Sequence, residues 1–134
     1  MKNHQMQIRV RYSETDQMRV VYHGNYAQYF EIGRVEWLRD KGISYKWMEE
    51  NGVMLPVVSL TMNYKKPARY DELLTLKTIM KKLSTVKIEF DYELYNEKEE
   101  LLTTGNSILV FVDMKTGKPI GPPTYISELL NRIE

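Results

Sequence analysis

The chain has 134 residues, a length typical of one domain with a modest core. Apolar residues make up 43% of the chain, and its net charge of +1 excludes a global attraction to nucleic acid or to an anionic membrane. Cysteine is absent, which excludes disulfides, thiolate metal ligands and a cysteine nucleophile.

Location and partners are predicted from the same composition. No apolar run reaches the length of a membrane span, and the first residues lack the apolar core of a signal peptide. The histidines are His4 and His23, and no suitable group of other ligands accompanies them, so no metal site is expected. We therefore expect a cytoplasmic protein without membrane or nucleic-acid partners.

The first predicted elements are a strand and a long helix. Apolar residues alternate with arginines over residues 6–12, which predicts a half-buried strand that ends at Tyr12. A loop then leads into a mostly apolar segment over residues 26–41, which predicts a helix. Asn25 is the expected N-cap, because its side chain can accept from the free amides of the first turn. Gly42 is the expected stop.

The long helix is predicted to be buried, because its apolar side chains spread round more than one stripe. Gly33 costs about 1 kcal/mol relative to Ala in mid-helix, so we expect the helix to approach another backbone there. On the solvent side, the spacing predicts i,i+3 ion pairs of Glu31 with Arg34 and of Glu36 with Arg39.

The remainder of the chain is mostly β in character. A short helix is predicted over residues 43–51 and a terminal helix over residues 124–132. Between them, alternating patterns predict four strands, over residues 57–66, 73–82, 85–95 and 100–112. The short turns at residues 82–84 and 96–98 imply antiparallel neighbours. One strand, one buried helix and four consecutive strands make an α+β pattern.

The most informative segment covers residues 12–26 and reads YSETDQMRVVYHGNY. Asp16 and His23 lie seven residues apart in it, just before the N-terminus of the long helix. Free amides and the positive end of the helix dipole stabilise a negatively charged oxygen there. A carboxylate beside such a helix end is a minimal set of groups for acyl transfer. On the residues alone, Asp16 can equally be a turn residue and His23 a structural histidine.

This segment resembles a known family, together with FE and RVEWLR inside residues 30–39 and the block YKKPARYDEL at residues 64–73. The chain is similar over nearly its whole length to the hotdog-fold acyl-CoA thioesterases of the 4-hydroxybenzoyl-CoA thioesterase and YbgC type. The resemblance implies a single domain over residues 1–134, with an antiparallel β-sheet wrapped around one long central helix. It also implies hydrolysis of an acyl-CoA thioester to a free carboxylic acid and CoA, without a cofactor. The family usually has Gly where this chain has Arg19.

The site residues are carried over from that resemblance. Asp16 would be the catalytic carboxylate, acting as a nucleophile or as a general base toward water. His23 would supply a backbone N–H that polarises the thioester carbonyl, with its ring in an assisting role. Tyr22 is expected to contact the substrate, and Asn63 to reach the site from a partner protomer. Glu31 is a reserve candidate, because other hotdog thioesterases use a glutamate on the helix.

A small basic cluster at the end of a strand consists of Lys65, Lys66 and Arg69. The cluster either keeps a sheet edge exposed to solvent or contacts the phosphates of CoA. We take its members as substrate-binding candidates. Other lysines compete for the same role, namely Lys81, Lys82 and Lys87.

Two other functions stay open at this point. One is a hotdog hydratase or dehydratase, against which the spacing of Asp16 and His23 argues. The other is a non-catalytic hotdog module that binds acyl-CoA, against which the retained Asp16 argues. The resemblance also implies a homodimer or a tetramer of paired dimers, with active sites at the interface between protomers.

Overall fold

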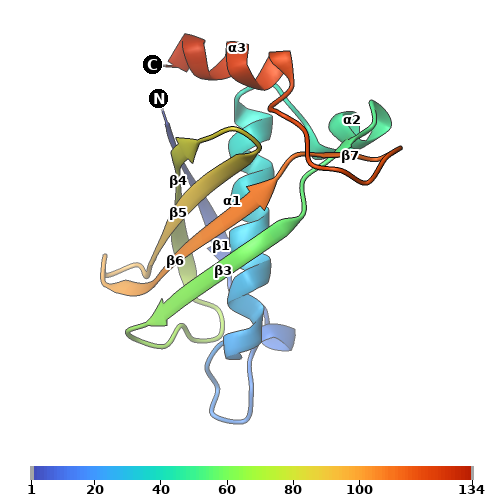
Figure 1. Cartoon of the computed structure of the whole chain (residues 1–134). Helices are drawn as coiled ribbons and strands as arrows, with labels where there is room; N and C mark the ends of the chain where they lie inside the picture. Colours follow the sequence, from blue (N-terminus) through green and yellow to red (C-terminus); the bar gives the residue numbers. More distant parts are fainter. Residues whose placement is uncertain (1, 134) are drawn as a thin grey trace.

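The computed structural model describes residues 2–133 and contains a five-stranded antiparallel sheet with one long helix, α1 (Tyr26–Asp40), against one face (Figure 1). The order of the strands across the sheet is β1 (Asn3–Arg9), β4 (Leu73–Leu83), β5 (Lys87–Tyr95), β6 (Leu101–Val110) and β3 (Val57–Tyr64). The smaller elements are α2 (Tyr45–Glu50), α3 (Thr124–Ile133) and a two-stranded pair of β2 (Val53–Met54) with β7 (Val112–Asp113). The predicted hotdog fold is confirmed.

The core forms between α1 and the inner face of β4, β5 and β6. Alternation along β5 is confirmed, because its apolar residues are buried and its charged residues face outward. Phe30 of α1 stacks on Tyr92 with ring centroids 4.5 Å apart, and Trp37 meets Phe90 edge-on at 5.3 Å. Aromatic pairs at such distances add to the burial of apolar area.

Two glycines let α1 lie close to the sheet. A β-carbon on Gly105 of β6 would lie 2.3 Å from the Phe30 ring, so that ring rests on bare backbone. A β-carbon on Gly33 would lie 2.5 Å from the hydroxyl of Thr78 and 2.8 Å from Leu76. The predicted approach of another backbone at Gly33 is therefore wrong, because the helix lies there against side chains of β4.

The two ends of α1 differ in how well they were predicted. Gly42 follows the helix with a left-handed φ of 93°, as expected of a glycine stop. The expected side-chain cap by Asn25 is wrong. A 3₁₀ turn, η2 (His23–Asn25), leads directly into α1, and the Asn25 side chain donates to the Glu14 carbonyl at 2.8 Å.

The first strand is shifted from its predicted position. β1 covers Asn3–Arg9, where it pairs with β4, and Tyr12 lies instead in a 3₁₀ turn, η1 (Tyr12–Glu14), with 78% of its surface exposed. Pairing along β4 extends the strand through polar residues that carry no apolar signal. Val10 is buried as expected.

One of the two predicted ion pairs on α1 forms. Glu36 and Arg39 are paired at the helix surface. Arg34 does not pair with Glu31, because the arginine is buried under the sheet and its Nη1 donates to the Tyr92 hydroxyl at 3.3 Å.

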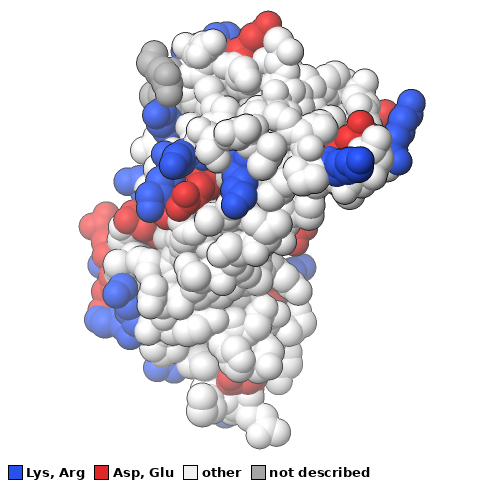
Figure 2. Space-filling view, viewed as in Figure 1, with Lys and Arg blue, Asp and Glu red and all other residues white. Residues whose placement is uncertain are grey.

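β3 is an edge strand that its own chain leaves largely uncovered. Within residues 2–133 it pairs with β6 alone, and α1 covers little of its inner face, where the Tyr26 ring lies 5.3 Å from the Tyr64 ring. Three apolar side chains predicted to be buried are 56%, 40% and 52% exposed, namely Val58, Leu60 and Tyr64. The surface over β3 is almost without charged side chains (Figure 2).

The remaining predictions concern turns and short helices. The turn after β5 is where it was expected, while β4 continues to Leu83 and moves the preceding turn to residues 84–86. The second helix begins after Ser44, whose hydroxyl accepts from the Trp47 amide at 3.0 Å. The terminal helix is confirmed as α3, which lies across one end of the molecule (Figure 1). Within residues 2–133, no helix is long and apolar enough to cross a membrane.

Candidate active site

Asp16 lies at the tip of a small hairpin. Its amide donates to the Val20 carbonyl at 2.9 Å, and Thr15 forms a β-bridge with Val21. The three residues between Asp16 and Val20 make the turn, in which the Arg19 amide donates back to the Asp16 carbonyl at 2.9 Å. A further bridge joins Val20 to Arg69, so the hairpin is held against the chain that follows β3.

Arg19 has a left-handed backbone, with φ of 65°. A three-residue hairpin loop commonly ends on such a residue, and glycine adopts this conformation without steric cost. The left-handed backbone thus explains why the resembled family usually has a glycine at this position. In this chain an arginine adopts that left-handed backbone conformation.

The carboxylate of Asp16 has one oxygen engaged and one available. Oδ1 accepts from the Met18 amide at 2.8 Å, which is the turn-stabilising role considered from the sequence. No hydrogen bond to Oδ2 is found within residues 2–133. The half-buried carboxylate is therefore oriented through Oδ1, while Oδ2 is left for a substrate or a water.

The helix N-terminus beside the hairpin is formed by η2. The Asn25 amide donates to the Tyr22 carbonyl, and the Tyr26 amide donates to the His23 carbonyl. The amides of His23 and Gly24 precede these bonds, so the helix cannot satisfy them internally. They are the donors that could meet a developing oxyanion.

Glu14 connects the hairpin to α1, a role that was not predicted from the sequence. Its carboxylate accepts from the Arg11 amide at 2.8 Å and from the Tyr29 hydroxyl at 2.9 Å, and its carbonyl accepts from Tyr22 and Asn25. Burial alone would raise the pKa of Glu14, but hydrogen bonds from Arg11 and Tyr29 outweigh it and leave that pKa below its ordinary value of 4.5. Glu14 is thus a buried, ionised anchor between two segments.

An open cleft of about 280 Å³ brings the main candidates together. It lies between the hairpin, the start of α1 and the end of β3. Its lining includes both catalytic candidates and two of the basic cluster, and the residues are Asp16, Met18, Val20, Val21, His23, Tyr26, Tyr64, Lys65, Lys66 and Pro67. Tyr64 also donates from its hydroxyl to the His23 carbonyl at 3.2 Å, which fixes the edge strand against the helix start.

The other predicted residues lie at different distances from this cleft. Tyr22 is half exposed beside His23, with ring centroids 4.4 Å apart. Arg69 lines an adjoining groove that shares Lys66 with the cleft. Asn63 points outward on β3, and Glu31 is exposed on α1; neither lines the cleft.

The basic cluster is only partly free. Lys66 is paired with Glu100, which competes with any phosphate. Lys65 has no ion pair within the described part of the chain. Residues 2–133 contain no group of three or more histidine, aspartate or glutamate side chains that could hold a metal ion.

A hotdog fold that brings a carboxylate to the N-terminus of its central helix is the arrangement of an acyl-thioester hydrolase. Comparison with known proteins agrees with this class. The family model described as the thioesterase-like superfamily matches residues 10–131, and the chain belongs to this family.

Several relatives are similar over most of their length. The acyl-CoA thioesterase candidate YneP of Bacillus subtilis is 40% identical over 114 residues, which are 85% of this chain and 83% of the relative. The acyl-CoA thioester hydrolase YbgC of Escherichia coli is 31% identical and covers 89% of each chain. The crystal structure of a DHNA-CoA thioesterase from Staphylococcus aureus superimposes with a TM-score of 0.94 at 39% identity, over 99% of this chain and 91% of the other. Thioester hydrolysis is thus favoured over the two other functions predicted from the sequence.

Proposed function

We propose that this thioesterase hydrolyses acyl-CoA to a free carboxylic acid and CoA, with Asp16 as its catalytic carboxylate. The observation that carries the proposal is that Asp16 and His23 line one cleft at the N-terminus of α1. A thioester carbonyl is already electrophilic and the CoA thiolate is a good leaving group. One placed carboxylate and one oxyanion donor are therefore sufficient for the reaction.

The carboxylate can act in two ways that give the same products. As a general base, Asp16 takes a proton from water, the resulting hydroxide attacks the carbonyl carbon, and the tetrahedral adduct expels the CoA thiolate. As a nucleophile, Asp16 attacks directly, expels the thiolate and forms an anhydride that water then cleaves. In both cases the carbonyl oxygen becomes negative next to the His23 and Gly24 amides, and the thiolate finally takes up a proton.

We propose that Lys65 binds the phosphates of CoA, with Lys66 and Arg69 as weaker contributors. Lys65 lines the cleft without an ion pair inside residues 2–133, whereas Lys66 must leave Glu100 in order to bind. Tyr22 lies beside His23, where it would contact the thioester arm.

We further propose a homodimer, or a tetramer of such dimers, formed through β3. The open inner face of β3 exposes apolar side chains, and an unpaired apolar edge is avoided in stable proteins. Asn63 points outward on the same strand, and we propose that it reaches the site of the partner protomer past this edge. Cytoplasmic location, the single domain over residues 1–134 and the lack of nucleic-acid and membrane partners stay predictions.

The roles of Asp16 and His23 are tested by comparing two variants. Asp16→Asn keeps the shape of the side chain and removes the basic carboxylate. We therefore expect the rate of hydrolysis to fall by at least about 10²-fold while acyl-CoA still binds. His23→Ala keeps its backbone amide, so we expect a smaller loss. Asp40→Asn, at the other end of α1, serves as the matched control and should keep the wild-type rate. Thiol release and calorimetric binding are the measurements.

Two results would contradict these assignments. Wild-type turnover by a pure Asp16→Asn preparation would return Asp16 to its turn role alone. A His23→Ala variant that is folded, dimeric and more damaged than Asp16→Asn would make the imidazole a direct participant.

The basic cluster is tested with Lys65→Gln, Lys66→Gln and Arg69→Gln. We expect Lys65→Gln to raise KM for acyl-CoA most and to weaken its salt dependence, because one cation near the phosphates is lost. Turnover of an acyl-pantetheine, which lacks the nucleotide, should not change. Lys118→Gln, which removes a lysine outside the cleft and the adjoining groove, is the control. Equal losses on both substrates would mean that the cluster shapes the reacting centre instead.

A further inference from the structure

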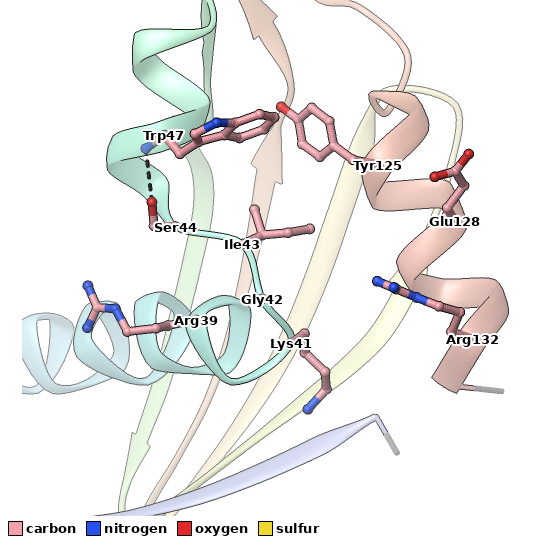
Figure 3. Close-up of a pocket in the computed structure, with 9 residues that line it drawn as sticks. All are labelled: Arg39, Lys41, Gly42, Ile43, Ser44, Trp47, Tyr125, Glu128 and Arg132. Carbon is pink, nitrogen blue, oxygen red and sulfur yellow. Dashed lines mark hydrogen bonds between the residues drawn. The ribbon is translucent and has the colours of Figure 1, made fainter.

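A larger cavity, of about 650 Å³, lies at the opposite end of α1 from the Asp16 hairpin (Figures 1 and 3). Its walls are the end of α1, the turn into α2 and one side of α3. The lining residues are Arg39, Lys41, Gly42, Ile43, Ser44, Trp47, Tyr125, Glu128 and Arg132. A helix of 15 residues is about 22 Å long, so this cavity is separate from the cleft at Asp16.

One wall of the cavity is aromatic. Trp47 of α2 is 45% exposed, which is unusual for the largest apolar side chain. Tyr125 of α3 meets its ring edge-on, with centroids 4.9 Å apart, and so holds the indole in one orientation. Ile43 lies between α1 and α2 below these rings in Figure 3. The indole thus offers a fixed flat surface to a ligand.

Three cationic side chains also line the cavity, namely Arg39, Lys41 and Arg132. Arg39 is paired with Glu36, and Lys41 is paired with Asp40 at 3.1 Å and lies over the Trp37 ring. Arg132 makes no ion pair within residues 2–133, and no hydrogen bond of its side chain is found there. Figure 3 shows its guanidinium extending from α3 toward the cavity, which Glu128 of the same helix also lines.

We infer that this cavity is a second ligand site, which binds a nucleotide with its base against Trp47 and a phosphate on Arg132. Every nucleobase has a flat face that stacks on an indole, and a guanidinium binds phosphate through two parallel hydrogen bonds. The volume falls within the roughly 300–1,000 Å³ of small-molecule sites.

The separation of the two groups selects a nucleotide over a small aromatic acid. Trp47 belongs to α2, and Arg132 to the last turn of α3, on opposite sides of the cavity in Figure 3. A ligand must therefore span the cavity in order to reach both. In a nucleotide the ribose separates the base from the phosphate, whereas an aromatic acid has no such spacer.

The test is a titration of the full-length protein with AMP and ADP, followed by tryptophan fluorescence and calorimetry. Stacking should quench the exposed Trp47 and leave the buried Trp37 unchanged. Arg132→Gln should weaken binding by about tenfold or more, because glutamine removes the charge and at least one of the two hydrogen bonds to the phosphate. Trp47→Leu should abolish the quenching. Lys118→Gln, which removes the same charge outside the cavity, and Asp16→Asn should both bind as the wild type does.

A second titration, with CoA, identifies the source of the nucleotide. If the site takes the nucleotide end of CoA, wild type binds two CoA per chain and Arg132→Gln binds one. If it takes free nucleotide only, CoA binds once in both proteins and AMP binds beside it. Nucleotide affinity that is unchanged in a folded Arg132→Gln variant, or lost in Asp16→Asn, would overturn the proposal, as would the absence of AMP and ADP binding. Because these experiments measure binding, their outcome does not depend on whether the protein hydrolyses acyl-CoA.

Discussion

Arg19 holds the hairpin that carries Asp16, although its own backbone is in a conformation that a β-carbon disfavours. The left-handed region costs roughly 1–2 kcal/mol for a residue other than glycine. The turn is kept because the bonds from Asp16 to Val20 and from Arg19 back to Asp16 fix both sides of it. The strain is local, and it can be measured without touching the carboxylate.

We expect Arg19→Gly to be more stable than Arg19→Ala by about 1 kcal/mol. Both variants remove the same side chain, but only glycine relieves the left-handed strain, and its larger unfolded-state entropy offsets part of the gain. Urea unfolding of the two variants at one protein concentration measures the difference. The same pair of substitutions at neighbouring Gln17, which lacks a positive φ, should show the opposite order.

Some individual side chains could be predicted from the sequence and others could not. Gly42 and the pair of Glu36 with Arg39 follow from local rules, because their partners are neighbours in the chain. Arg34 was mispredicted because its partner, Tyr92, is 58 residues away and binds it in the core. Glu14 was missed for the same reason, since its partner Tyr29 belongs to α1.

The hairpin and α1 behave as one unit because Glu14 joins them. Its carboxylate is buried and ionised, and it holds Arg11 on one side and Tyr29 on the other. Folding lowers the pKa of Glu14, so its contribution to stability is fully present above the ordinary value of 4.5 and is lost as the pH falls through the folded value. The stability of the protein should therefore fall in acid as Glu14 becomes protonated.

We expect Glu14→Gln to lower the free energy of unfolding at pH 7 by about 1.5 kcal/mol, the scale of a lost hydrogen bond to a charged group. The deficit should shrink as the pH falls below 4.5, because the carboxylate is then protonated in the unfolded chain and, below its lowered folded pKa, in the native protein too. Unfolding curves at several pH values measure it. Glu36→Gln, on the surface of α1, is the control and should change little. A deficit that grows with acid would contradict the assignment.

Helices and strands were predictable where periodicity reflects burial against α1. The clean alternation of β5 and the apolar surface of α1 were sufficient to place both elements. β1 was shifted because its polar first half is ordered by pairing with β4 and not by burial. In β3, alternation correctly placed the strand but implied burial that one protomer does not provide. The alternating apolar side chains of β3 are thus consistent with the proposed dimer, in which a partner protomer would cover them.

The whole assembly is expected to be at least a dimer. The two free edges of the sheet are β1 and β3, and β3 exposes apolar side chains while the outward residues of β1 are mostly polar. Light scattering should therefore give at least twice 15.9 kDa. Leu60→Lys places a charge on the exposed inner face of β3 and should yield a folded, inactive monomer. Gln5→Lys on β1 should leave the dimer intact.

Mixed dimers test whether the active site is shared. If Asn63 of one protomer serves the Asp16 site of its partner, dimers of Asp16→Asn and of Asn63→Ala are each impaired. Mixing the two variants leaves one intact composite site in each heterodimer, because a two-fold axis pairs each loop with the opposite strand. Random exchange makes half of the dimers mixed, so about a quarter of the wild-type activity should return. A fully active Leu60→Lys monomer, or no recovery from dimers that mass spectrometry shows to be mixed, would mean that each protomer carries a complete site of its own.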